Sequence, residues 1–234
     1  MREDGVMGIG YRQQRIEGSV RYRLLRRTDE VRKYIQMYST GNTILDVGTA
    51  DGLMLTFLRN PRLMFFGIDL SLDLLKSGGD RGLKLVQADA GHLPIGGERV
   101  DVIIATAVLE HLCNPEESVR EFSRVLRGKG IVIATSPNPF FDVIASKIGY
   151  IEGEKHVKRF NLGGLKSLFE SAGYVILEAR SFMPSPFFGI PFEKNIEDIL
   201  NKVGLGFIMT NQVVVCEKPV KEGYAGVKCT PLDG

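Results

Sequence analysis

Cysteine is scarce in this 234-residue sequence: there are only Cys113, Cys216 and Cys229, and no two of them form a CxxC pair. Such a scattered set argues against a disulfide framework and a thiolate metal site, and it favours a reducing compartment. No apolar run reaches the roughly 20 residues that a membrane-spanning helix needs. The first residues also lack the apolar region of a secretory signal. We therefore expect a cytoplasmic protein with no membrane span.

An excess of one charge is also missing, because 30 Lys and Arg stand against 28 Asp and Glu, for a formal net charge of +2. So small an excess does not point to a polyanionic partner, and we do not expect nucleic acid as one. The hydrophobic content of 44% and the charged content of 25% are those of a globular protein. The length suits one α/β domain or two small ones.

Short aliphatic runs alternate with helical stretches through the middle of the chain. Strands are predicted at 43–48, 63–70, 84–90, 100–108 and 131–137, and helices at 51–59, 71–79 and 117–130. Continuous aliphatic strands, each followed by a helix, predict a parallel sheet covered on both faces. Right-handed crossovers make that sheet doubly wound, as in Rossmann-like α/β folds.

The C-terminal third has a different pattern. A helix is predicted at 162–173, a strand at 174–182 and a last strand at 207–218. The insertion 183–206 is rich in proline and phenylalanine before a short helical piece, and we interpret it as a lid or a contact surface through which the chain could form an oligomer. We divide the chain into an N-terminal arm and cap helix (1–41), a core domain (42–218) and a loose tail (219–234).

The stretch ILDVGTADG, Ile44 to Gly52, joins the first predicted strand to the first helix of the core domain. Small residues in such a turn let a ligand approach the backbone near the positive end of the helix dipole. Dinucleotide enzymes place G-x-G-x-x-G there, but this chain has no such motif. Asp46 and Asp51 would repel a pyrophosphate and favour a cationic or zwitterionic ligand. S-adenosylmethionine, which carries a sulfonium and an ammonium group, fits that description.

An acid followed by a G-x-G-x-G-like loop resembles the first motif of class I S-adenosylmethionine-dependent methyltransferases, and the similarity runs from about Asn42 to Lys218. Ala50 stands where the family usually has its central glycine. The resemblance implies a seven-stranded, mostly parallel sheet whose last strand is antiparallel beside the sixth. It also implies that the loop binds the cofactor through Asp46, Gly48, Thr49, Ala50 and Gly52.

Asp69 closes the second predicted strand, 21 positions after Gly48. A carboxylate there can accept hydrogen bonds from both ribose hydroxyls of an adenosine cofactor. The alternative role is a helix N-cap, for which Ser71 is better placed. We therefore assign Asp69 to the ribose and Leu70, the next residue, to the adenine.

The resemblance places two more motifs on the cofactor. It implies that Asp89 binds the adenine amino group, that the backbone amide of Ala90 binds a ring nitrogen, and that Thr106 lies at the cofactor near the end of the fourth strand. The region from Val100 to Pro139 is similar to the fourth-to-fifth-strand region of the small-molecule branch of the superfamily.

Candidates for the chemistry follow the fourth strand and precede the helix predicted at 162–173. Methyl transfer from a sulfonium needs alignment and exclusion of water, and it needs a base only if the acceptor must lose a proton. Glu110 and His111 follow strand four, and His156 resembles a histidine of many small-molecule members; local packing or a solvated loop remains the alternative for each. Some relatives bind a metal through E-x-x-E-H here, but Ala107 replaces the first glutamate, so we expect no metal.

The N-terminal segment has helical spacing of Val20, Leu24, Val31 and Ile35. Between residues 11 and 33 it holds eight basic residues against three acids; they are Arg12, Arg15, Arg21, Arg23, Arg26, Arg27, Arg32 and Lys33. A solvated helix face is the first interpretation, contact with an anionic substrate or a membrane surface the second, and RNA the third.

These observations predict S-adenosylmethionine-dependent methyl transfer to a small-molecule acceptor. Two alternatives stay open: a methyltransferase of RNA or protein that uses the basic N-terminal arm, and a non-catalytic regulator that binds S-adenosylmethionine.

Overall fold

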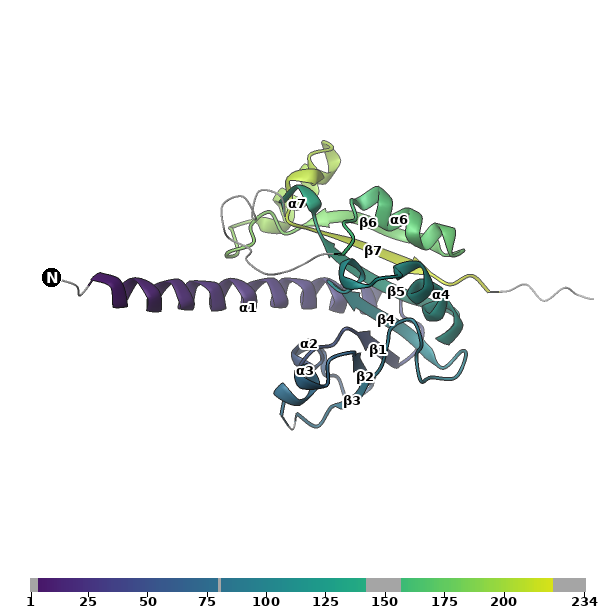
Figure 1. Ribbon diagram of the computed structural model, residues 1–234. Coiled ribbons are helices and arrows are strands. Elements are labelled where there is room, and N and C mark those ends of the chain that lie inside the picture. Colours follow the sequence, from purple (N-terminus) through teal and green to yellow (C-terminus); the bar gives the residue numbers. More distant parts are fainter. Residues whose placement is uncertain (1–3, 80, 142–156, 221–234) are drawn as a thin grey trace, which may run out of the picture.

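A seven-stranded sheet forms the centre of the computed structural model, which describes residues 4–79, 81–141 and 157–220, with side chains described from residue 18 onward. The strand order is β3-β2-β1-β4-β5-β7-β6, and β7 runs antiparallel to both of its neighbours (Figure 1). The strands are β1 (Thr43–Val47), β2 (Met64–Asp69), β3 (Lys84–Gln87), β4 (Val100–Thr106), β5 (Leu126–Pro137), β6 (Val175–Phe182) and β7 (Asn211–Glu217). The doubly wound sheet with an antiparallel last strand is therefore confirmed.

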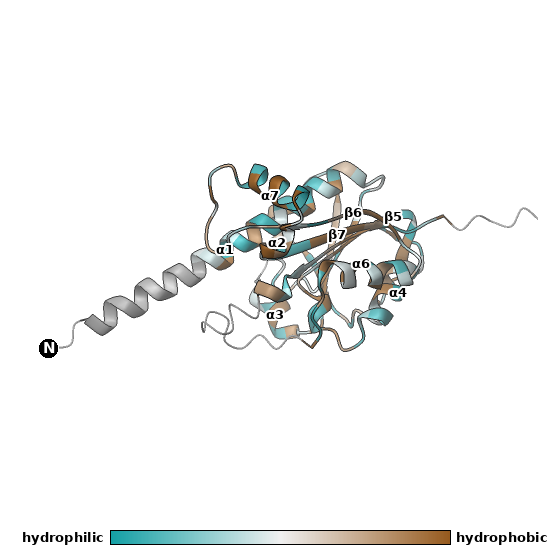
Figure 2. Ribbon diagram, turned by 90° about the horizontal axis from the view of Figure 1, so that it is seen from above, coloured by the Kyte–Doolittle hydropathy of each residue, from teal (hydrophilic) through white to brown (hydrophobic). Residues whose placement is uncertain are grey.

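Helices cover both faces of this sheet, and the alternation of side chains along each strand separates two hydrophobic clusters. One cluster joins the sheet to α4 (Pro115–Val125) and α6 (Leu162–Ser171). The other joins it to α1 (Asp4–Tyr38) and α2 (Leu53–Leu58). The remaining described helices are α3 (Leu72–Ser77), α7 (Glu193–Lys202) and the short 3₁₀ turns η1 (Leu109–His111) and η2 (Gly206–Ile208). In Figure 2 the strands β5, β7 and β6 lie side by side in the middle of the molecule.

Four element boundaries differ by three or more residues from the sequence-based prediction. The helix predicted at 117–130 ends at Val125, and β5 begins at the next residue, because Leu126 pairs with Val100 of β4. The strand predicted at 84–90 ends at Gln87. The last strand begins only at Asn211, since η2 occupies part of the segment before it. In each case the pairing between strands determines the boundary, and hydrophobic periodicity along the sequence does not predict that pairing.

The helix α1 is long, with 35 residues, and in Figure 1 it runs past the edge of the sheet. Its C-terminal part is anchored in the core, where Val31 and Tyr34 are fully buried. No helix of the described residues has both the length and the apolar character that a membrane crossing requires.

Five charged side chains tie α1 to β6 and α7, and we call them the ion-pair cluster. They are Arg26 and Glu30 of α1, Arg180 of β6, and Glu193 and Glu197 of α7. Arg26 lies 2.6 Å from Glu197 and 3.3 Å from Glu193, and Arg180 lies 2.5 Å from Glu30 and 3.4 Å from Glu197. Glu197 also accepts the backbone N–H of Met183 at 2.8 Å. The solvated-face interpretation is therefore wrong for Arg26, which is 7% exposed, because partners far along the chain surround it.

Candidate active site

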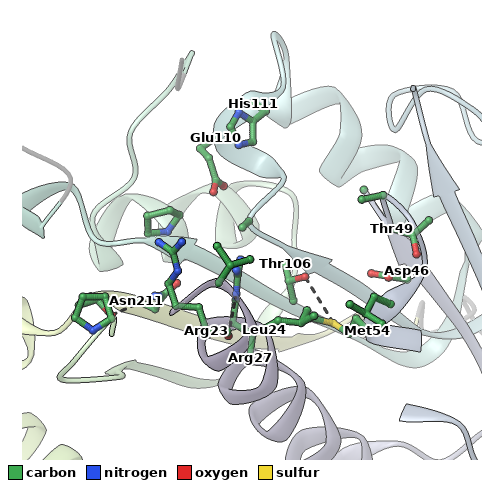
Figure 3. A pocket seen from close by; sticks show the side chains of 18 of the residues that line it. Arg23, Leu24, Arg27, Asp46, Thr49, Met54, Thr106, Glu110, His111 and Asn211 are labelled. Atoms are coloured by element: carbon green, nitrogen blue, oxygen red, sulfur yellow. Dashed lines mark hydrogen bonds between the residues drawn. The ribbon is translucent and has the colours of Figure 1, made fainter. Parts of the chain in front are cut away.

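A pocket of about 340 Å³ opens beside the carboxyl ends of β1 and β4 (Figure 3). Its wall comes from the β1–α2 loop, the turn after β4, the ends of β5 and β7, one face of α1, and Pro186 of the 183–206 insertion. Ligands of open α/β sheets bind at this edge, where the strand order reverses. The pocket is thus the place where ligand chemistry is expected.

The β1–α2 loop depends on left-handed backbone. Gly48 and Gly52 both have φ of 74°, and Ala50, with φ of 50°, takes the same region despite its Cβ. A Cβ on Gly48 would stand 2.6 Å from Val108, so both conformation and space require glycine there. The departure at Ala50 therefore leaves the tight turn intact, at a cost of about 1–2 kcal/mol for the left-handed alanine.

Asp46 lies at the end of β1 and is 2% exposed. Burial raises the pKa of its carboxyl to about 7; the Thr49 hydroxyl opposes this rise and the charge of Asp69 adds to it. The buried Oδ1 of Asp46 has no hydrogen-bond partner among the described residues. An unpaired buried acceptor on the wall of a pocket suits a ligand with an N–H donor, and a cationic ammonium would satisfy it best. The loop therefore fits the amino-acid end of S-adenosylmethionine.

Asp69 closes β2 and holds the loop from the other side. Its Oδ2 accepts the N–H of Ala50 at 2.9 Å, and its Oδ1 accepts the N–H of Ser71 at 2.9 Å. Ser71 is the N-cap of α3, as predicted, since its hydroxyl accepts the N–H of Leu74 at 3.3 Å. Each carboxylate oxygen of Asp69 has further lone-pair capacity for a ligand.

The structure brings together only part of the predicted set. Asp46, Gly48, Thr49, Ala50, Thr106 and His111 line the pocket. The pocket wall does not include Gly52, Asp69, Leu70, Asp89 and Ala90, which lie on or beside the neighbouring α2, β2 and β3 elements. Leu70 is 69% exposed and Asp89 is also exposed, whereas Ala90 packs in the core.

The second acid of the loop is paired, which weakens the charge argument made from the sequence. Arg81 Nη1 lies 3.1 Å from Asp51 Oδ2, and the same nitrogen donates to the Asp51 backbone carbonyl. A pyrophosphate would therefore meet less negative charge than the sequence alone indicates. The remaining argument against a dinucleotide cofactor is that the sequence has no G-x-G-x-x-G motif.

Glu110 and His111 reach the pocket from η1, just after β4. The chain turns into η1 at Ala107, which has φ of 51° and donates its N–H to the carbonyl of Thr135 at 2.9 Å. Glu110 is 2% exposed and His111 is exposed, and both line the pocket. His156 lies outside the described residues. Within the described part of the chain, no group of three or more His, Cys, Asp or Glu side chains gathers as metal ligands.

The side chains of Arg23 and Arg27 project from α1 into the pocket (Figure 3). From the sequence, contact with an anionic substrate was only the second interpretation of the basic segment, and it singled out neither arginine. The spacing of Val20, Arg23, Leu24 and Arg27 places all four on one helix face. The signal was present, because both arginines interrupt the apolar stripe that continues through Val31. Arg21, by contrast, is exposed, as a solvated face requires.

Comparisons with known proteins agree with this geometry. A family model described as a methyltransferase domain matches residues 45–134. A tRNA (carboxymethyluridine(34)-5-O)-methyltransferase of Arabidopsis thaliana is 34% identical over 109 residues, which are 45% of this chain and 26% of that protein. A malonyl-[acyl-carrier protein] O-methyltransferase of Hamiltonella defensa is 24% identical over 148 residues, 62% of this chain and 54% of that protein. The chain therefore spans between a quarter and about half of the length of these relatives.

A solved structure agrees over nearly its whole length. The S-adenosylmethionine-dependent methyltransferase of Archaeoglobus fulgidus superposes with a TM-score of 0.61 at 16% identity, covering 85% of this chain and 96% of that one. At that identity the likeness concerns the fold. Together, the β1–α2 loop, the sheet order and the matched domain lead to one conclusion: residues 45–134 match the methyltransferase-domain family, and the sheet around them has the fold of an S-adenosylmethionine-dependent methyltransferase.

Proposed function

We propose that the protein transfers the methyl group of S-adenosylmethionine to a small-molecule acceptor and releases S-adenosylhomocysteine. The observation that carries the proposal is the composition of the pocket wall. The β1–α2 loop with Asp46 forms one end of the wall. Other parts of the wall carry Glu110, His111 and the arginines of α1, and these polar side chains suit a polar acceptor.

We assign the cofactor contacts as follows. The β1–α2 loop, with Asp46, Gly48, Thr49, Ala50 and Gly52, holds the amino-acid part, and Thr106 lies beside it. Asp69 and Leu70 hold the ribose and the adenine from β2, and Asp89 with the Ala90 amide binds the adenine edge. The unpaired Oδ1 of Asp46 and the open lone pairs of Asp69 support this assignment.

When bound, the cofactor supplies an activated methyl group, so the chain's own residues mainly align the acceptor and exclude water. A base is required only if the acceptor gives up a proton. We assign this role to His111, which is exposed and lines the pocket, with His156 as the second candidate. His111→Ala should then lower turnover by about 10²–10⁴-fold, while the affinity for S-adenosylhomocysteine stays close to that of the wild type.

The test follows label from methyl-labelled S-adenosylmethionine into three fractions: a panel of small carboxylic acids, phosphate esters and amines; bulk tRNA; and protein. His92→Ala, which removes an exposed histidine that does not line the pocket, is the matched control for His111→Ala. We expect label in the small-molecule fraction. Label only in tRNA or protein would replace our proposal with the macromolecular alternative. Tight cofactor binding with no transfer to any fraction would replace it with the regulator.

One observation favours RNA as a second candidate acceptor, namely the Arabidopsis relative that is named for a tRNA nucleoside. Against it, three of the basic residues of α1 turn inward: Arg26 to the ion-pair cluster, and Arg23 and Arg27 to the pocket. The inward arginines leave fewer cations for a phosphate backbone.

The 183–206 insertion contributes Pro186 to the pocket, in keeping with a roof over the acceptor. It also exposes large apolar side chains, with Phe188 at 60% and Phe192 at 80%. Association of two chains through this insertion stays a prediction.

A further inference from the structure

The face of α1 that crosses the pocket carries two guanidinium groups. Arg23 and Arg27 stand four residues apart and line the pocket together with Val20 and Leu24. Farther along, the same face is formed by Val31 and other residues buried in the core. This face of α1 is therefore apolar where it packs in the core and carries two cationic side chains where it lines the pocket.

Arg23 is the unusual member of this pair. Its Nε is buried and has no hydrogen-bond partner, and none of the described acids forms an ion pair with it. The neighbouring arginines differ: Arg26 is held by Glu193 and Glu197, and Arg32 by Asp29 at 2.6 Å. Arg23 as a whole is partly buried, and a partly buried guanidinium group gains most from an anion that also fills the hydrogen bond of its buried Nε.

The described acids around the pocket do not supply this missing anion. Asp51 is paired with Arg81. Figure 3 shows Asp46 and Thr49 at one end of the pocket and Arg23 near Asn211 at the other. Glu110 reaches in from η1 on the opposite wall and forms no ion pair with Arg23 within 4.0 Å. Among the residues that the structure describes, no acid therefore occupies the space next to Arg23, and an anion that comes with a ligand can take this place.

We propose that Arg23, with Arg27 beside it, binds a carboxylate or phosphate group of the acceptor, so that the substrates of this pocket are anionic small molecules. The planar guanidinium fork forms two parallel hydrogen bonds to such groups. Arg27 lines the same pocket, and its Nε donates to the carbonyl of Arg23 at 3.4 Å. This inference rests on the proposed function, since it specifies the acceptor of that reaction.

The experiment uses the full chain saturated with S-adenosylhomocysteine, at constant ionic strength set with sodium chloride. Malonate and inorganic phosphate are titrated by calorimetry, and malonamide serves as the uncharged match of malonate. We expect saturable binding of both anions and none of malonamide. Arg23→Gln should weaken malonate binding by tenfold or more. Arg21→Gln removes the same charge from the exposed face of the same helix and should leave binding unchanged.

Each outcome decides a different question. Equal malonate binding by the wild type and Arg23→Gln would overturn the inference. Malonate that binds only without S-adenosylhomocysteine, and competes with it, would also overturn it, because the arginines would then hold the cofactor's own carboxylate. Failure of the wild type to bind S-adenosylhomocysteine would overturn the proposed function itself. If Arg23→Gln no longer binds the cofactor, Arg23→Lys replaces it; malonate binding that stays at the wild-type level without the fork would again contradict the inference.

Discussion

At the scale of single residues, the buried carboxyl group of Asp46 lowers the stability of the folded protein, and we expect the same group to bind the cofactor. Its pKa, raised by burial to about 7, lies above the ordinary value of 3.8. As pH rises from about 4 to about 7, the unfolded chain releases this proton while the folded chain retains it, so the free energy of unfolding falls over that window. Above about 7 the folded carboxyl is ionised as well and the loss is complete.

Asp46→Asn places a neutral side chain of the same shape at this position. The cofactor-free variant should be more stable than the wild type at pH 8, by about 2–4 kcal/mol, and should lack the slope between pH 4 and 7. Its affinity for S-adenosylmethionine should fall by about tenfold or more, because a charge-assisted hydrogen bond is lost. Urea unfolding at several pH values and calorimetry measure the two effects. Asp73→Asn, on an exposed acid of α3, is the control and should change neither; an unchanged pH slope in Asp46→Asn would contradict the assignment.

At the scale of elements, the ion-pair cluster fixes α1 and with it the arginines of the pocket. Glu197 is 1% exposed and contacts Arg26, Arg180 and the N–H of Met183. Glu197→Ala leaves buried cations short of a partner and should lower the free energy of unfolding by about 3–5 kcal/mol. Asp198→Ala, one position away on the exposed side of α7, should stay within about 0.5 kcal/mol. A loss below about 1 kcal/mol for Glu197→Ala in chemical denaturation would show that the cluster does not hold α1.

The same elements show what the sequence can and cannot predict. Continuous aliphatic runs predict β1, β4 and β5 because both sheet faces are covered, and the small-residue loop at 48–52 predicts the site because its backbone needs left-handed φ. The end of α4 was misplaced, since the pairing of Leu126 with Val100 is a tertiary contact.

Ion-pair partners that lie far apart in the sequence are also not predictable from hydrophobic periodicity. Arg26 and Glu197 are 171 residues apart, so a reading of one helix sees only a charged residue that faces solvent. Arg23 and Arg27 were not singled out among the eight basic residues for the same reason: an arginine on a helix indicates a solvated face until the structure shows a pocket beside it.

At the scale of the whole molecule, we expect the protein to bind S-adenosylmethionine along the carboxyl edge of β1 and β2, as a class I methyltransferase does. The most direct measurement is calorimetry of the intact chain with S-adenosylmethionine, S-adenosylhomocysteine and NAD. Asp69→Ala serves as the site variant and Asp73→Ala as the matched control.

We predict that both adenosyl ligands bind and NAD does not. Asp69→Ala should weaken them by about tenfold or more, because hydrogen bonds to a carboxylate contribute about 1.5–3 kcal/mol each, whereas Asp73→Ala should bind like the wild type. Tight binding of NAD without any response to S-adenosylmethionine or S-adenosylhomocysteine would contradict the account.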